Sequence, residues 1–325
     1  MSRLEPLALL RRFREIGIAV FLLFVIVAAS VASPRFLLPG NLRNILLDVP
    51  LNIVVAMGMT AIIISRNIDL SVGSMLGLCG MAAGLLLKAH PGLPIIFGAA
   101  LAVGLGLILG AVNGGLVAYC RVPAIIATLA TLSIYRGFVF WMSGGRQVDP
   151  NDVPPALIRF AQTSPVGVPS IVLLAFAVAA AAHGFLRYQR AGREIYAVGN
   201  NPVAARLRGI PVEKTVFRVF ALTGALSGLA GVMYAARYGF VSPGKTGAAF
   251  ELEVIAAAVI GGANVYGGAG SVAGTLLGCL LLAVIKNALI VTGLSATWQL
   301  AAYGAILLIA VLADALLRNR AEGAE

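Results

Sequence analysis

Long apolar runs recur along almost the whole chain, and they constrain its fold more than any other feature. A helix needs about 20 consecutive apolar residues to cross the hydrocarbon core of a bilayer. Such runs cover residues 16–33, 45–65, 71–89, 94–119, 123–142, 168–186, 215–236, 252–268, 271–292 and 297–317. The sequence therefore predicts an all-α, polytopic transmembrane helical bundle with about ten spans. The runs over 45–65 and 252–268 are the weakest, so eight spans with re-entrant segments is the alternative.

The composition excludes a soluble protein. Of the 325 residues, 60% are apolar and 11% are charged, whereas soluble domains average about 45–50% and about 25%. The loops are too short for an independent soluble domain, so residues 1–325 are predicted to form a single transmembrane domain. Any ATPase or ligand-capturing module must then lie on another chain. The three cysteines lie in apolar runs without a CxxC pair and are expected to be core residues: Cys79, Cys120 and Cys279.

Basic residues, which give the chain a net charge of +11, gather in three places. They precede the first apolar run (Arg3, Arg11, Arg12, Arg14), follow the last (Arg318, Arg320), and fill the loop over 187–218 (Arg187, Arg190, Arg193, Arg206, Arg208, Lys214, Arg218). Basic residues mark the cytoplasmic side of a membrane. We therefore expect a multi-pass protein of the cell inner membrane, with both termini and the 187–218 loop cytoplasmic. The run over 16–33 is expected to be a retained span rather than a cleaved signal peptide.

Two places in the apolar pattern look broken. One is the polar stretch from Arg66 to Ser74, and the other is the glycine-rich stretch from Gly261 to Gly270. Non-helical backbone at membrane depth is tolerated where protein buries it or where it lines a wet cavity, and paired interruptions in two halves of a chain point to a transport site. A faint echo between residues 73–77 and 270–274 suggests an internal repeat, although glycine-rich chains produce such matches by chance.

The 187–218 loop carries the signals of a short helix. Asn200 or Asn201 can cap it, Pro202 suits its first turn, and Gly209 followed by Pro211 ends it. A short, mildly amphipathic helix of this kind fits a groove on a partner protein. The alternative is a basic loop that only fixes the topology.

Several strings carry a family resemblance. They are Gly-x-x-x-Tyr-Ala-x-Gly-x-Asn from Gly192, Ala-Ala-Arg and Gly-Ile within 204–210, Ile-Asp-Leu-Ser-Val-Gly-Ser over 68–74, the run 123–137, Phe-Glu-Leu over 250–252, and 256–270. Together they resemble the permease subunits of bacterial sugar ABC importers, of the ribose, rhamnose and autoinducer-2 type in the branched-chain amino acid/ribose permease superfamily. Arg66-Asn67 stands where Gly-Gly is frequent, which is more similar to the rhamnose and autoinducer-2 branches.

The resemblance implies a transport role without enzymatic activity or cofactor. It implies a second, identical or different permease subunit, an ABC ATPase subunit that hydrolyses ATP, and a periplasmic sugar-binding protein. The ATPase would be coupled through the loop helix, at Pro202, Ala204, Ala205, Arg206, Arg208 and Gly209. The alternative function is an ion-gradient-driven secondary transporter of a small polar solute, whose buried ionisable candidates are few: Asp69, Lys286 and Asp314.

Polar residues near the first break are candidates for a translocation path, because hydroxyl and amide groups offer weak hydrogen bonds to a sugar. They are Asn67, Asp69, Ser71, Asn113, Thr128 and Thr131, with Ser133 as a further candidate. Asp69 has three interpretations: it caps the next helix by accepting from backbone N–H groups over 70–72, it contacts sugar hydroxyls, or it pairs with Arg66. Each of the other residues alone is also consistent with a helix–helix contact.

The remaining features concern the outer side. Glu251 and Glu253 would either contact basic residues of a docking binding protein or stabilise the next helix by interacting with the positive N-terminal end of its dipole. Arg136 is expected to snorkel to the outer interface. Residues 239–246 match the letters of a phosphate-binding loop, but that loop requires a buried strand before it and a soluble α/β domain around it. We expect no nucleotide, catalytic or metal site in the chain.

Overall fold

The computed structural model describes residues 5–293 and the single residues 298, 301, 304, 305, 308 and 312. The fold over these residues is all-α, with an isolated bridge between Val148 and Val241 as its only β pairing. Its helices are α1 (Glu5–Ala32), α2 (Pro39–Ile64), α3 (Val72–Ala89), α4 (Ile95–Ala118), α5 (Ala124–Ser143), α6 (Pro155–Gln162), α7 (Ser170–Tyr188), α8 (Arg190–Asn200), α9 (Pro202–Leu207), α10 (Val212–Tyr238), α11 (Phe250–Ile260) and α12 (Val272–Val291).

Eight of these helices are long and apolar enough to cross a membrane, counted over the described part of the chain: α1, α2, α3, α4, α5, α7, α10 and α12. They match eight of the predicted runs, including the weak one over 45–65. The prediction of a span over 252–268 is wrong, because α11 has 11 residues, about 16 Å of helix. The run over 297–317, Asp314 and the basic residues beyond it lie almost entirely outside the described residues.

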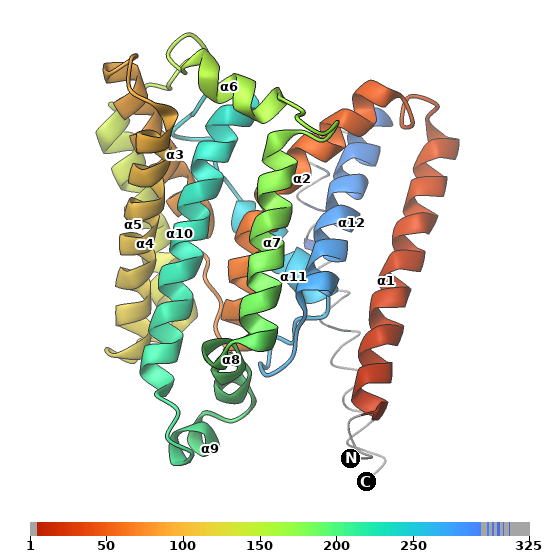
Figure 1. Ribbon diagram of the computed structural model, residues 1–325, viewed down its shortest axis with the longest axis vertical. Helices are drawn as coiled ribbons and strands as arrows, with labels where there is room; N and C mark the ends of the chain where they lie inside the picture. The colour runs from red at the N-terminus through yellow and green to blue at the C-terminus, as the bar shows by residue number, and fades with distance from the viewer. Residues whose placement is uncertain are drawn as a thin grey trace.

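The helices run between two faces of the bundle. One face carries α8 and α9 and is called here the α9 face; the other carries α6 and is called the α6 face (Figure 1). The lower end of α1 lies on the same side as α8 and α9 (Figure 1). The basic residues of the 187–218 loop therefore share one side of the bundle with the start of the first span.

The bundle contains two arms that run in opposite directions. In the first arm α2 runs toward the α9 face, residues 65–71 turn back into the bundle, and α3 runs to the α6 face (Figure 1). In the second arm α10 runs to the α6 face, residues 239–249 turn back inward, and α11 continues toward the α9 face. The interruption over 66–74 is thus confirmed, and its counterpart in the second arm is 239–249. The glycine-rich stretch over 261–270 forms the turn between α11 and α12.

The two re-entrant segments meet inside the bundle. A Cβ on Gly73, in the first turn of α3, would overlap the backbone carbonyl of Gly247, and a Cβ on Gly247 would overlap that of Gly73. The counterpart of α3 by its order after a re-entrant segment is α11, not α12. The echo between residues 73–77 and 270–274 links the starts of α3 and α12, so it does not relate equivalent positions.

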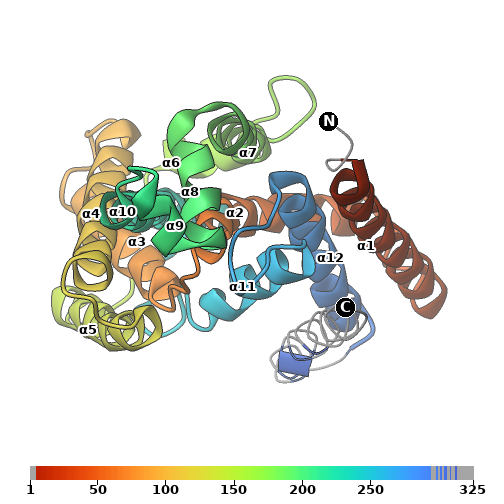
Figure 2. The ribbon, with the colours of Figure 1, turned by 90° about the horizontal axis from the view of Figure 1, so that it is seen from below.

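Helix α10 lies inside the bundle and packs on α4, α3 and α2, whereas α1 lies at its edge against α12 (Figure 2). Small residues allow the close approach of α10 to its neighbours. A Cβ on Gly80 of α3 would lie 2.8 Å from the carbonyl oxygen of Gly231, and one on Gly58 of α2 would lie 2.9 Å from the side chain of Thr223. The high glycine content thus supports backbone-to-backbone packing of the central helices.

Candidate functional site

The re-entrant segment over 65–71 begins with a sharp reversal at the end of α2. Arg66 adopts a left-handed conformation, with φ of 67°, and its Nε–H donates to the backbone carbonyl of Tyr266 at 2.7 Å. Asn67 donates from Nδ2 to the carbonyl of Ser65 at 2.8 Å. These bonds hold the reversal next to the turn between α11 and α12. The predicted ion pair of Arg66 with Asp69 is not formed.

Asp69 fixes the other end of this segment. Its Oδ1 accepts from the backbone N–H of Ser71 at 2.8 Å and from the Ser71 hydroxyl at 2.7 Å. Of the backbone N–H groups over 70–72 that are predicted to donate to Asp69 as a helix cap, Ser71 alone donates to it, and the N-cap residue of α3 is Ser71 itself, without a side-chain cap bond. The side chain is fully buried, and its Oδ2 has no hydrogen-bond partner among the described residues. The segment therefore contains one carboxylate oxygen that is available to another donor.

A chain of hydrogen bonds extends from Asp69 to the two helices α4 and α5. Asn113 of α4 donates from Nδ2 to the Ser71 hydroxyl at 2.7 Å. Tyr135 of α5 donates to the carbonyl of Leu109 at 2.9 Å and lies 3.2 Å from Oδ1 of Asn113. Sequence reasoning did not assign Tyr135 to the site, although its place one helical turn beyond Thr131 on the same face of α5 was a usable signal.

The two threonines of α5 complete the set. Thr128 lies 3.4 Å from the carbonyl of Ile68 and also donates to the carbonyl of Ala124 at 2.8 Å. Thr131 donates to the carbonyl of Thr128 at 3.2 Å. The structure thus brings Asp69, Ser71, Asn113, Thr128 and Thr131 together, buried and bonded to one another or to backbone. Asn67 lies apart from them, at the start of the segment, and Ser133 is exposed on α5 with a bond to the carbonyl of Leu129.

The second re-entrant segment is held by Arg136 of α5. Its Nη1 donates to the backbone carbonyls of Pro243 and Thr246, at 2.9 and 2.8 Å. The prediction that Arg136 snorkels to the outer interface is therefore wrong, because its guanidinium turns inward and replaces the hydrogen bonds that this non-helical backbone lacks. The stretch that resembles a phosphate-binding loop forms this segment, without a preceding strand in the described chain.

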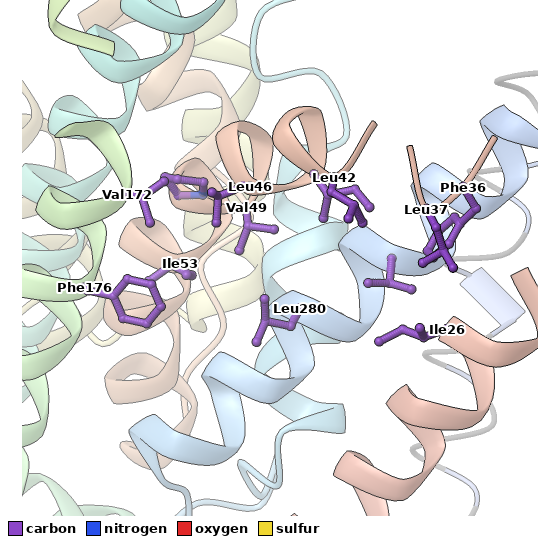
Figure 3. Close-up of a pocket in the computed structure, with 13 residues that line it drawn as sticks. Ile26, Phe36, Leu37, Leu42, Leu46, Val49, Ile53, Val172, Phe176 and Leu280 are labelled. Carbon is purple, nitrogen blue, oxygen red and sulfur yellow. The ribbon is translucent and has the colours of Figure 1, made fainter. Parts of the chain in front are cut away.

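Two cavities of contrasting chemistry lie beside α2. The cavity between α1, α2, α7 and α12, of about 190 Å³, is lined by apolar side chains that point into a common space (Figure 3). The second, of about 350 Å³, lies where α2, α10, α11 and α12 meet the 239–249 segment. It is called here the polar cavity, and its lining includes Asp48, Asn52, Tyr234, Tyr238, Phe240, Lys245, Glu253 and Lys286.

Both acidic residues of α11 lie in its first turn, where the helix dipole favours negative charge. Glu253 pairs with Lys286 of α12 at 3.1 Å and accepts from Asn52 at 3.2 Å. Glu251 is half-buried, and a Cβ on Gly73 would lie 2.6 Å from its Oε2. The predicted docking of a binding protein at these two residues stays a prediction.

Helix α9 forms as its sequence signals indicate. The side-chain oxygen of Asn201 accepts from the backbone N–H groups of Val203 and Ala204, both at 3.0 Å, Pro202 occupies the first turn, and Gly209 ends the helix with φ of 76°. Two apolar side chains remain uncovered, Val203 at 66% and Leu207 at 85% exposure. Val203 and Leu207 are not among the residues predicted for coupling. Of the other predicted residues, Ala205 is buried, Arg206 pairs with Glu213, and Ala204 and Arg208 are exposed.

Helix α8 fixes α9 to the first re-entrant arm. A Cβ on Gly199, near the end of α8, would overlap the carbonyl oxygen of Ile64, the last residue of α2. Gly268 donates its N–H to the same carbonyl at 2.9 Å, and the Tyr196 hydroxyl donates to the carbonyl of Gly270 at 3.1 Å. The glycines and the tyrosine of the resemblance strings therefore join α8, α2 and the 261–271 turn.

Comparisons with known proteins identify the family of the chain. Residues 41–311 match the family model described as the permease component of a branched-chain amino acid transport system. The chain is 39% identical over 297 residues to the ribose import permease protein RbsC of Escherichia coli K12, covering 91% of this chain and 92% of that one. It is 35% identical over 305 residues to the autoinducer 2 import system permease protein LsrC of Escherichia coli O157:H7, covering 94% and 88%.

A third relative, the ribose import permease protein of Haemophilus influenzae, is 36% identical over 303 residues, covering 93% of each chain. No solved structure matches the chain. The family resemblance indicated by the sequence strings is confirmed, since the matches extend over nearly the whole chain. The chain is a member of the family of branched-chain amino acid transport system permease components.

Proposed function

We propose that this chain is the permease subunit of an ABC importer for a sugar or sugar-like small molecule of the ribose, rhamnose or autoinducer-2 type. The observation that carries the proposal is its similarity, over more than nine-tenths of its length, to both ribose and autoinducer-2 import permeases. The chain conducts the substrate through the inner membrane, and the α9 face lies in the cytoplasm because it carries the basic loop.

The importer requires further chains. ATP is hydrolysed on a separate ABC ATPase subunit, a periplasmic binding protein delivers the substrate, and a second permease subunit completes the membrane part. Helix α9 supports this arrangement, because Val203 and Leu207 present uncovered apolar side chains on the basic face. A short helix with an apolar edge is the element that a groove on a partner protein accepts.

Coupling follows from the way α9 is attached. It is joined through Asn201 to α8, and α8 abuts the end of α2 at Gly199 and Ile64 with no side chain between the backbones. Displacement of α9 by the ATPase therefore displaces the start of the 65–71 segment. The path residues Asp69, Ser71, Asn113, Thr128 and Thr131 then exchange their hydrogen bonds to one another and to backbone for bonds to the passing substrate, and Asn67 offers its side chain at the start of the segment. The free Oδ2 of Asp69 is an acceptor for its hydroxyl groups.

The test compares two substitutions of the same kind on opposite faces. Leu207→Asp places a charge on the exposed edge of α9, and Val166→Asp places one on the exposed 163–169 loop of the α6 face, where Val166 is 72% exposed. We expect Leu207→Asp to abolish both co-purification of an ATPase and ATP-dependent uptake of labelled sugar, with membrane insertion intact. Val166→Asp should retain both.

Mass spectrometry of the mild-detergent complex identifies the co-purified chains. Normal uptake by the Leu207→Asp variant would refute the docking role of α9. Absence of an ATPase from the wild-type complex, together with uptake that an uncoupler stops at constant ATP, would replace the proposal by a gradient-driven transporter.

A further inference from the structure

The polar cavity differs from an ordinary packing defect in its size and its lining. Its volume of about 350 Å³ falls within the range of about 300–1,000 Å³ typical of small-molecule sites. It lies toward the α6 face, between the first half of α2 and the last turns of α10 and α12. Aromatic and charged side chains converge on it from five different parts of the chain, as in sites that bind and orient a ligand.

One wall of the cavity is aromatic. The ring centroids of Tyr234 and Tyr238 lie 4.5 Å apart, and Phe240 lies 6.1 and 6.3 Å from these two rings. The three rings therefore form one aromatic cluster, contributed by the end of α10 and the start of the 239–249 segment, in which Phe240 lies edge-on to Tyr234 at 85°. Such a cluster offers an apolar face with a hydroxyl at its edge. A sugar presents the complementary combination of a C–H face and a rim of hydroxyl groups.

The remaining walls provide hydrogen-bonding groups in fixed positions. Glu253 is held between Lys286 and Asn52, at 3.1 and 3.2 Å. Asp48 accepts from Nε of Arg237 at 2.9 Å and from the Tyr238 hydroxyl at 3.2 Å. Carboxylates held in this way keep lone pairs that can accept from further donors. Because their positions are already fixed, little conformational entropy is lost when a ligand binds to them.

The charges that line the cavity indicate the class of ligand. The two carboxylates of the cavity are each paired, Asp48 with Arg237 and Glu253 with Lys286, and the remaining charge of the lining, Lys245, is exposed. Because the carboxylates are already paired, the cavity offers hydrogen-bonding groups while its one cation without a carboxylate partner among the described residues is exposed. This combination suits a neutral polyhydroxylated molecule better than an anion or a cation.

The position of the cavity relates it to the re-entrant segments. Gly247 lines the cavity and also abuts Gly73 of α3, which lies four residues beyond Asp69. The Gly73–Gly247 contact is thus the boundary between the polar cavity and the Asp69 network. A solute that enters from the α6 face meets the aromatic wall before it reaches this contact.

We propose that the polar cavity binds the transported molecule in transit, as a neutral sugar packed against the aromatic cluster of Tyr234, Tyr238 and Phe240 with its hydroxyl groups on Asp48, Asn52 and Glu253. This inference rests on the proposed function, because it names where a single permease chain holds the substrate. It also predicts that a neutral sugar binds more tightly than a phosphorylated one, since Asp48 and Glu253 already occupy Arg237 and Lys286 and the exposed Lys245 alone is left to compensate a dianion.

The experiment measures binding to the full chain alone, without ATPase or binding protein. Saturation-transfer NMR on the protein in lipid nanodiscs uses D-ribose and L-rhamnose as neutral probes and ribose 5-phosphate as the charged probe. We expect Tyr238→Ala to weaken binding of the neutral probe that binds by about three- to tenfold, the loss of one aromatic contact. Tyr238→Phe, which keeps the ring, should bind within about twofold of wild type. Trp141→Ala, an exposed aromatic of α5 outside the cavity, is the matched control and should bind as wild type.

Two results would overturn the inference: no neutral sugar bound by the wild-type chain, or binding unchanged in both Tyr238→Ala and Phe240→Ala. Preferential binding of ribose 5-phosphate would overturn the assignment of a neutral ligand. Failure of the proposed function has a different signature, since the assembled complex would then import none of the sugars while the purified chain still bound one in a Tyr238-dependent way.

Discussion

The hydrogen-bond chain around Asp69 makes a quantitative prediction about stability, because its members do not contribute equally. Ser71 is the central link, since its hydroxyl donates to Asp69 and accepts from Asn113. Ser71→Ala removes a bond to a carboxylate, worth about 1.5–3 kcal/mol, and leaves the buried Asn113 amide without that acceptor, at a further cost of about 1–3 kcal/mol. The expected loss in the free energy of unfolding is therefore about 2.5–6 kcal/mol.

Asn113→Ala should cost less, although it removes a larger side chain. The Ser71 hydroxyl keeps its bond to Asp69, and the Tyr135 hydroxyl keeps its bond to the carbonyl of Leu109. No buried donor is left unpaired, so the loss is that of two neutral hydrogen bonds, about 1–3 kcal/mol. Ser133→Ala repeats the serine change at an exposed site with a single intrahelical bond and should stay within about 0.5 kcal/mol of wild type.

The measurement is unfolding of the detergent-solubilised protein by titration with a denaturing detergent, followed by circular dichroism. The order of destabilisation, Ser71→Ala above Asn113→Ala above Ser133→Ala, is the result that tests the reasoning. An equal or larger loss for Asn113→Ala would refute it, because the cost would then arise from packing volume rather than from unpaired polar groups.

Two further predictions concern other parts of the bundle. Gly199→Ala should destabilise the protein by about 1–3 kcal/mol or more, because a Cβ there overlaps the Ile64 carbonyl. The control variant Gly184→Ala places its Cβ in open space and should be neutral. Thermal unfolding of both variants measures the difference. The hydrogen bond from Lys88 lowers the pKa of Asp152 below its usual value, so the pair stabilises the fold above about pH 4 and loses this effect as the pH falls through the lowered pKa. Lys88→Met should thus be less thermally stable than wild type at neutral pH, and this loss of stability should vanish on acidification. A loss that grows on acidification would contradict the reasoning.

The sequence indicates the spans well because length and apolar content decide whether a helix crosses a bilayer. It fails at α11 because apolar content does not register backbone conformation. Gly262, Gly267 and Gly268 all have positive φ, so the helix ends at Ile260, where the glycine-rich stretch that interrupts the predicted span begins. The short loop helix is predictable in detail, since Asn201, Pro202 and Gly209 act through local backbone chemistry.

The site is predictable in its members but not in their contacts. Asp69 and Ser71 are two residues apart, so their bond is local, whereas the bonds to Asn113 and Tyr135 depend on how α4 and α5 pack. Arg136 points inward because the second re-entrant segment provides unpaired carbonyls, which no local pattern reveals. The polar cavity had one available signal. Asp48 and Asn52 are four residues apart near one apolar run, and polar groups on one face of a spanning helix indicate function.

The most consequential feature of the fold is the rigidity of the contacts that join the α9 face to the polar cavity. The backbone of α8 abuts α2 at Gly199 and Ile64, and the backbone of α3 abuts the 239–249 segment at Gly73 and Gly247. Between these two contacts the chain runs through the 65–71 segment, which the Asp69 hydrogen bonds hold in one shape. Flexible side chains absorb small displacements by changing rotamer, but backbone-to-backbone contacts have none to change. Under the proposed function, a movement of α9 that keeps both contacts closed must move the wall of the polar cavity. A movement that separates Gly73 from Gly247 instead connects the cavity to the Asp69 network.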